Sequence, residues 1–123
     1  METVVTGKAP SAVGPYSQAI VSGDFVYTSG QLGANKEGVI EGDIARQTEN
    51  AIKNLSEVLL AAGSRLDRVV KTTCYLAKIS DFAAFNEIYG RYFSHKPART
   101  LTEAAALPKG SLVEIDAIAE KRK

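Results

Sequence analysis

Apolar residues recur at helical spacing in two stretches of the chain. In the first, the apolar face consists of Ile44, Ala51, Ile52, Leu55, Val58, Leu59 and Ala62, and the polar face of Glu49, Asn50, Lys53 and Glu57. This pattern predicts an amphipathic helix that begins after Asp43 and stops at Gly63. The second stretch can be capped by Ser80 or Asp81. Its apolar face consists of Phe82, Phe85, Ile88, Tyr89 and Tyr92.

Alternation of apolar and polar residues predicts strands around these helices. Residues 17–21 and 25–29 flank a Ser-Gly-Asp turn and predict a hairpin, and residues 100–106 can also be extended. Residues 68–76 alternate, with Val70, Thr72, Cys74 and Leu76 on one side and Val69, Lys71, Thr73 and Tyr75 on the other. Residues 112–119 alternate as well, with Leu112, Glu114, Asp116 and Ile118 opposite Val113, Ile115, Ala117 and Ala119. Both alternating segments are typical of strands with one buried face.

The order of these elements predicts an α+β fold in which two helices pack on one face of a mostly antiparallel or mixed sheet. Such a sheet leaves its other face without cover. We therefore expect a closed homo-oligomer, with ligand sites in the clefts between its subunits.

Composition limits the possible functions. A chain of 123 residues, 45% hydrophobic and 24% charged, is expected to form a single domain over residues 1–123. Its net charge of +1 gives no general field to hold a polyanion, so nucleic acid is not an expected partner. One cysteine and one histidine exclude an internal disulfide and an ordinary structural zinc site. The sequence shows neither a signal peptide nor an apolar run long enough to span a membrane, and a cytoplasmic protein without membrane contact is expected.

Two charged residues are candidates for chemistry. Glu114 lies on a strand whose other face is apolar, with Asp116 on the same side roughly 7 Å away. A partly buried carboxylate there could shuttle protons, whereas acidic residues on an open strand more often simply face solvent. Arg99 follows a proline-stiffened segment, and its guanidinium suits bidentate capture of a carboxylate or phosphate, or an ordinary surface ion pair. Tyr16 and Ser29, beside turns, could line a pocket or serve turn chemistry.

Several motifs in order resemble the RidA/YjgF family of reactive-intermediate (enamine/imine) deaminases. They are Gly-Pro-Tyr-Ser-Gln-Ala at 14–19, Thr-Ser-Gly-Gln at 28–31, Phe-Asn-Glu-Ile-Tyr at 85–89, Pro-Ala-Arg-Thr at 97–100, and the segment 107–119. The resemblance runs from about residue 9 to residue 119. It implies a chorismate-mutase-like fold assembled as a homotrimer, with clefts between neighbouring subunits.

The activity that this resemblance implies is hydrolysis of 2-aminoacrylate and 2-aminocrotonate, or of the imines 2-iminopropanoate and 2-iminobutanoate, to 2-oxo acids and ammonia. No metal or cofactor is implied. The substrates would be small 2-imino or 2-enamino carboxylates released by pyridoxal-phosphate enzymes such as threonine and serine dehydratases. These enzymes are functional partners in that sense.

The resemblance also assigns roles to single residues. Arg99 matches the arginine that grips the substrate carboxylate, and Glu114 matches the glutamate that activates the attacking water. Tyr16, Ser29 and Gly30 match residues that line the pocket, part of which should come from the adjacent subunit. Where many members have cysteine, this chain has Leu101, which could still bind a ligand through its backbone.

Two other functions stay open at this point. The same cleft could belong to a non-catalytic module that binds 2-oxo acids or similar carboxylates and reports amino-acid status to a regulator. RNA cleavage or inhibition of translation, ascribed to some relatives, is less compatible with a net charge near zero.

Overall fold

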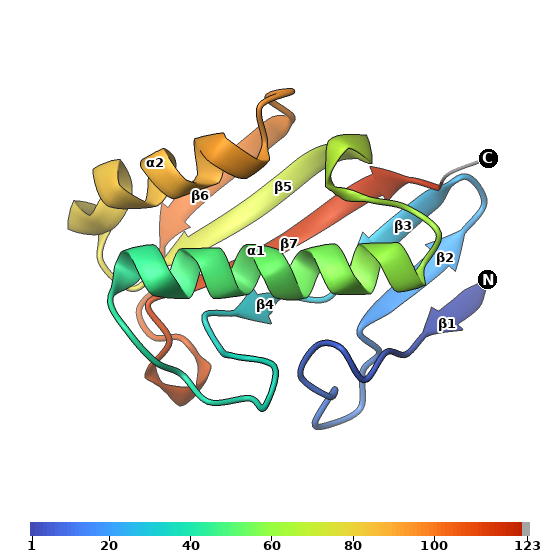
Figure 1. Cartoon of the computed structure of the whole chain (residues 1–123), viewed down its shortest axis with the longest axis horizontal. Helices are drawn as coiled ribbons and strands as arrows, with labels where there is room; N and C mark the ends of the chain where they lie inside the picture. The colour runs from blue at the N-terminus through green and yellow to red at the C-terminus, as the bar shows by residue number, and fades with distance from the viewer. Residues whose placement is uncertain (122–123) are drawn as a thin grey trace.

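The computed structural model describes residues 1–121 and contains a mixed sheet of seven strands with two α-helices (Figure 1). The strands are β1 (Glu2–Val4), β2 (Ala19–Ser22), β3 (Phe25–Thr28), β4 (Gln31–Leu32), β5 (Val69–Leu76), β6 (Ala98–Glu103) and β7 (Val113–Glu120). Their order in the sheet is β1-β2-β3-β7-β5-β6, and β4 pairs with β7 as well. The β5–β6 pair is parallel and the other pairs are antiparallel. The predicted α+β class and mixed sheet are confirmed.

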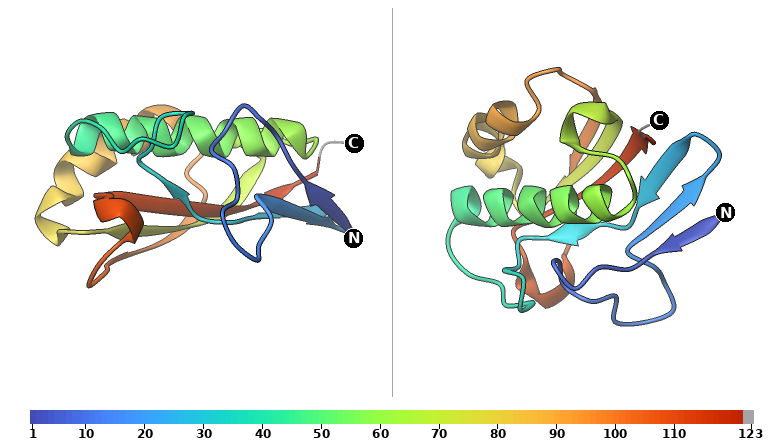
Figure 2. Two further views of the ribbon diagram at one scale, coloured as in Figure 1. Left: turned by 90° about the horizontal axis from the view of Figure 1, so that it is seen from below. Right: turned by 45° about the vertical axis from the view of Figure 1, so that its right-hand side comes forward.

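Both helices, α1 (Ile44–Ala61) and α2 (Phe82–Tyr92), lie on one face of the sheet, as the edge-on view in Figure 2 shows. Asp43 caps α1, since its side chain accepts a hydrogen bond of 3.0 Å from the Arg46 amide. Gly63 follows the end of α1 with φ +82°, a conformation that glycine adopts without strain. The predicted start and stop of this helix are confirmed.

The core lies between the helices and the sheet, and the alternation in β7 explains how it forms. Val113, Ile115, Ala117 and Ala119 are buried under the helices, whereas Glu114 and Asp116 lie on the opposite face and are partly exposed. Apolar side chains of α1 and α2, among them Leu55 and Phe85, complete this core with no exposure. The acidic side chains of β7 therefore point away from the core, as the pattern predicted.

Four local predictions are wrong. A bulge between Val69 and Lys71 reverses the alternation at the start of β5, so that Val69 is buried and Val70 exposed. Asn50, predicted on the polar face of α1, is only 8% exposed. The extended segment near residue 100 begins at Ala98 and ends at Glu103, before the three consecutive alanines. β2 likewise begins two residues later than predicted.

The face of the sheet opposite the helices mixes apolar, aromatic and charged side chains. Phe25, Tyr27 and Ile118 are 37%, 42% and 37% exposed there. Strand register places Tyr27 beside Ile118 and Tyr75 beside Glu114 on this face. Among residues 1–121, no helix is both long and apolar enough to cross a bilayer.

Candidate functional site

A cavity of about 690 Å³ opens at one end of this face. Its walls come from the loop before β2, the β3–β4 segment, the turn before β7, and β7 itself. The described lining residues are Pro10, Ser11, Ala12, Val13, Tyr16, Gln18, Thr28, Ser29, Gly30, Gln31, Leu32, Ala34, Gly38, Pro108, Lys109, Glu114 and Asp116. Four of the residues predicted for a site, Tyr16, Ser29, Gly30 and Glu114, therefore lie around one cavity.

Glu114 lies directly against Gly30. In the short β4–β7 pairing, Leu32 is opposite Glu114 and Gln31 is opposite Ile115, so the preceding glycine lies on the same face as Glu114 and diagonal to it. A Cβ atom on Gly30 would overlap the Glu114 carboxylate. Gly30 therefore provides the space that the carboxylate occupies, a reason for glycine at a position where φ is not positive.

Two carboxyl groups in the cavity hold their protons more tightly than usual. Burial raises the pKa of Glu114, and the neighbouring charge of Asp116 raises it further. Burial also raises the pKa of Asp116, although a hydrogen bond from Thr73 and the charge of Lys71 oppose this shift. A carboxyl group whose pKa approaches the working pH is well suited to exchange protons with water or substrate.

These raised pKa values predict that the folded chain loses stability as pH increases. Carboxyl groups of the unfolded chain ionise near pH 4, while Glu114 and Asp116 in the folded chain ionise at higher pH. Over this window the folded state binds more protons, so their contribution is full below pH 4 and is lost as pH rises through the raised values. Urea unfolding from about pH 4 to about pH 7 should show a shallower decline for Glu114→Gln than for the wild type. Equal slopes would contradict the prediction.

Tyr16 and Ser29 are held in place by the backbone around them. The Tyr16 hydroxyl accepts a hydrogen bond of 3.3 Å from the Val13 amide, and the residue is 53% exposed. The Ser29 hydroxyl donates to the Ser17 carbonyl, which ties the segment after β3 to the loop before β2. Both side chains thus contribute to the wall of the cavity.

Gln18 is a structural residue of the site that the sequence analysis missed. Its buried amide donates to the carbonyls of Thr6 and Pro10 at 3.1 and 2.9 Å, and its oxygen accepts from the Thr6 amide at 2.7 Å. These three bonds close the loop that carries one wall of the cavity. A glutamine in a turn-rich segment gives no sequence signal of its own, because its partners are backbone groups.

Replacing Gln18 by alanine should loosen this loop. The loss of three hydrogen bonds to backbone groups is expected to lower the free energy of unfolding by about 1–3 kcal/mol. Hydrogen exchange should become faster for the amides of residues 6–17. Lys8→Ala, an exposed change in the same loop, is the control and should behave as the wild type. Equal exchange in the two variants would show that Gln18 does not hold the loop.

Arg99 and Leu101 lie elsewhere in the described chain. They pair with Thr72 and Cys74 of β5, whose side chains are buried on the helix side of the sheet. The Arg99 guanidinium accordingly lies over aromatic rings of α2. Within a single chain, Arg99 and Glu114 therefore do not meet, because the two residues lie on opposite faces of the sheet.

Three further residues, Cys74, His95 and Lys109, have ordinary surroundings. Cys74 is buried, and burial raises the pKa of its thiol to about 11. A ring nitrogen of His95 lies 2.9 Å from the Val69 carbonyl. Lys109 lines the cavity and donates to the Gly38 carbonyl at 3.3 Å. Within residues 1–121, no group of three or more His, Cys, Asp or Glu side chains is placed to hold a metal ion.

Comparison with known proteins identifies a matching family and several relatives. A family model described as Endoribonuclease L-PSP matches residues 6–121. A human protein named 2-iminobutanoate/2-iminopropanoate deaminase is 48% identical over 119 residues, which cover 94% of this chain and 87% of the human one. The crystal structure of RidA from an Antarctic Psychrobacter is 43% identical, with a TM-score of 0.94 over 98% of this chain and 99% of that one.

A third relative carries a small ligand. The structure of Escherichia coli TdcF with bound serine is 33% identical and has a TM-score of 0.94, covering 99% of this chain and 100% of TdcF. Both the matched span and the level of identity far exceed what a shared fold alone requires. The chain therefore belongs to the Endoribonuclease L-PSP family, which is the YjgF/RidA family.

Proposed function

We propose that this protein is a 2-iminobutanoate/2-iminopropanoate deaminase that releases 2-oxo acids and ammonia. The observation that carries the proposal is the half-buried Glu114 carboxylate, packed against Gly30 in a cavity that Tyr16 and Ser29 also line. The deaminase name of the human relative supports the reaction. The serine bound to TdcF supports a small amino-acid-like ligand.

The charged groups that one chain supplies to the cavity are mostly acidic, which favours a further cation for an anionic substrate. Among the described residues, the charged side chains that line it are Glu114, Asp116 and Lys109, and Lys109 already donates to Gly38. Two carboxylates repel the carboxylate of an imino acid. We assign the missing cation to Arg99 of a neighbouring copy, since Arg99 lies near the β6 edge of the sheet. A homotrimer with clefts between its subunits is the assembly proposed, and the uncovered apolar residues Phe25, Tyr27 and Ile118 are consistent with one.

The chemistry follows from these groups. Arg99 binds the substrate carboxylate and Glu114 orients a water molecule beside the iminium carbon. The water oxygen bonds to this carbon, the π electrons move to nitrogen, and a water proton passes to Glu114. Glu114 returns this proton to nitrogen, and the carbon–nitrogen bond breaks as the hydroxyl oxygen forms the carbonyl and its proton passes to Glu114, so that ammonia leaves. Glu114 then gives the proton to solvent. One iminium ion and one water thus give one 2-oxo acid, one ammonia and one proton.

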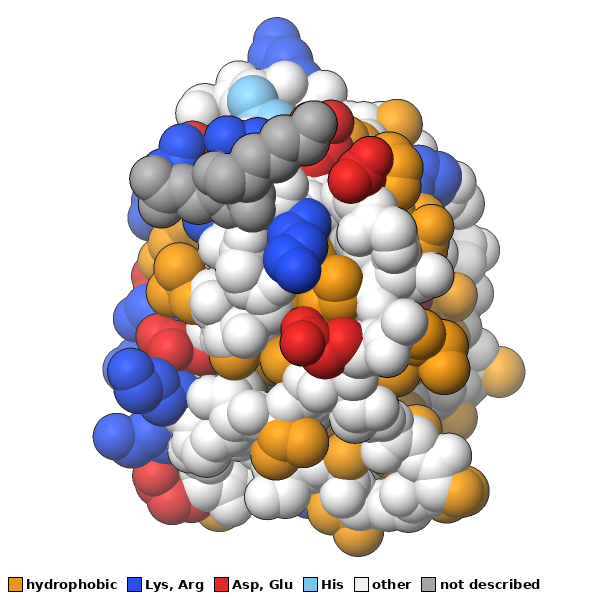
Figure 3. All heavy atoms as spheres, turned by 90° about the vertical axis from the view of Figure 1, so that its right-hand side faces the viewer, with side chains coloured by type: hydrophobic (Ala, Val, Ile, Leu, Met, Phe, Trp, Pro, Cys, Tyr) orange, Lys and Arg blue, Asp and Glu red, His pale blue; other side chains and the backbone are white. Residues whose placement is uncertain are grey.

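The same charges weigh against RNA as the ligand of this cavity. Phosphate groups would face Glu114 and Asp116, which repel them. At the end of the molecule shown in Figure 3, basic side chains gather along one edge with acidic side chains among them. We therefore expect no RNA cleavage by this cavity.

The proposed activity can be tested by generating the unstable imine enzymatically in the presence of this protein. Threonine dehydratase is mixed with threonine, and the appearance of 2-oxobutanoate is followed with and without this protein, while light scattering gives the molar mass of its assembly. Faster release by a trimer supports the proposal. If a folded trimer does not accelerate release but binds 2-oxobutanoate, the cleft belongs to a non-catalytic binding module. RNA cleavage that the cavity variant Glu114→Gln abolishes would also contradict the proposal.

A further inference from the structure

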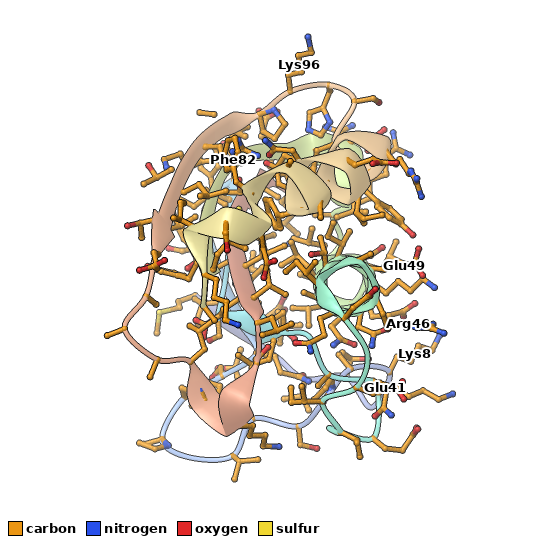
Figure 4. All side chains as sticks on the ribbon, turned by 90° about the vertical axis from the view of Figure 1, so that its left-hand side faces the viewer. Lys8, Glu41, Arg46, Glu49, Phe82 and Lys96 are labelled. Carbon is orange, nitrogen blue, oxygen red and sulfur yellow. The ribbon has the colours of Figure 1, made fainter. Side chains whose placement is uncertain are left out.

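The side chain of Arg99, a residue of β6, packs against α2 through several contacts. Its Nη1 donates a hydrogen bond of 2.7 Å to Oδ1 of Asn86. Its guanidinium carbon lies 4.9 Å from the ring centre of Tyr89, 5.8 Å from that of Phe82 and 5.9 Å from that of Phe85. These four α2 residues share one helical face, because they are spaced by three and four positions. Phe82, labelled in Figure 4, lies at the start of α2.

Tyr89, whose ring lies beneath the Arg99 guanidinium, is itself held in place. Tyr89 is 7% exposed, stacks on Phe93 at 4.5 Å between ring centres, and exchanges a hydrogen bond of 2.8 Å with Thr72. Thr72 is the strand partner of Arg99, so the strand pair holds both the arginine backbone and the ring beneath its guanidinium. Side-chain motion of Arg99 is thereby restricted on this side.

Asn86 can orient the Arg99 guanidinium without neutralising its positive charge. A guanidinium has two edges that can bind a carboxylate, and a bond through Nη1 leaves the edge formed by Nε and Nη2. An aspartate in place of Asn86 would hold the same nitrogen but would neutralise the cation. An amide oxygen holds the group and keeps its full positive charge for another anion.

We propose that Asn86 is a positioning residue: it fixes the Arg99 guanidinium above Tyr89 so that the Nε–Nη2 edge is presented to a substrate carboxylate in the cleft of a neighbouring copy. The inference rests on the proposed function for the identity of that carboxylate. The orientation of Arg99 itself is independent of it.

The first test measures orientation without any ligand. NMR of the arginine side chains reports rotation about the Nε–Cζ bond, and the Arg99 signal is assigned by its loss in Arg99→Lys. Rotation should be slow in the wild type and in Asn86→Asp, and about tenfold faster in Asn86→Ala. Glu87→Ala, an exposed change on the same helix, is the matched control and should leave the rotation slow. Unchanged rotation in Asn86→Ala would overturn the inference.

The second test separates orientation from charge in turnover of 2-iminobutanoate. Asn86→Ala should raise KM about tenfold with kcat within about threefold of the wild type, since the bond lost acts on binding. Asn86→Asp should raise KM further although its guanidinium stays oriented. Equal kinetics for the two variants, or a matching loss in Glu87→Ala, would indicate a structural role only and overturn the inference. Absence of turnover in the wild type would instead contradict the proposed function, and the NMR result would still decide the orientation of Arg99.

Discussion

Arg99→Ala is expected to lower kcat/KM for 2-iminobutanoate at least 100-fold. Removing the partner of a desolvated carboxylate costs about 3–5 kcal/mol, which corresponds to roughly 150- to 4000-fold in binding. The side chain is only partly buried and lies at the surface of α2, so the variant should fold and assemble as the wild type does. The coupled assay with threonine dehydratase measures the rate, and light scattering the assembly.

Arg91→Ala is the matched control for this variant. Arg91 belongs to α2, the helix against which the Arg99 side chain packs, and forms an exposed ion pair with Glu87, with the arginine side chain 61% exposed. Its removal should change the rate less than twofold, because exposed ion pairs contribute about 0–1 kcal/mol. Normal deamination by a folded Arg99→Ala assembly would remove Arg99 from the site.

Glu114→Gln is expected to separate turnover from binding. Glutamine fills the same space against Gly30 but cannot accept the water proton, so kcat should fall by roughly 10²- to 10⁴-fold, the usual contribution of a general base. Binding of 2-oxobutanoate, measured by calorimetry, should stay within about twofold, because the carboxylate contact is made by Arg99.

The control for Glu114 lies on the same strand. Glu120 is exposed, is not among the residues described as lining the cavity, and shares the strand parity of Glu114. Glu120→Gln should therefore deaminate at the wild-type rate. A Glu114→Gln variant with normal kcat would show that another group activates the water.

The sequence predicted the fold best where one face of an element is purely apolar. β7 has this property. The first helix was predicted from apolar residues at helical spacing, and its capping by Asp43 and termination near Gly63 are local events that need no partner. At the start of β5, by contrast, Val69 and Val70 are both apolar, so alternation could not show the bulge that decides which of them is buried. Asn50 shows the same limit, because burial of a polar side chain depends on its neighbours in space.

The candidate site was predictable only in part. Chemistry alone singled out Glu114 and Arg99, whereas Tyr16, Ser29 and Gly30 gained their roles from the family resemblance. The opposite placement of Arg99 and Glu114 depends on strand register, since pairing with Thr72 turns Arg99 to the helix side. The bond from Arg99 to Asn86 arises only when α2 packs beside β6, and no spacing in the sequence predicts it.

The position of β7 between β3 and β5 has a consequence for how the protein is made. During synthesis, the hairpin of β2 and β3 and the strand β5 emerge from the ribosome long before residues 113–120. Until those residues emerge, β3 and β5 both lack their common hydrogen-bonding neighbour, and the sheet cannot close. Glu114 arrives with that same strand. A nascent chain therefore completes its sheet and acquires its proposed water-activating group in a single late event, and earlier intermediates expose unpaired strand edges that chaperones are suited to protect.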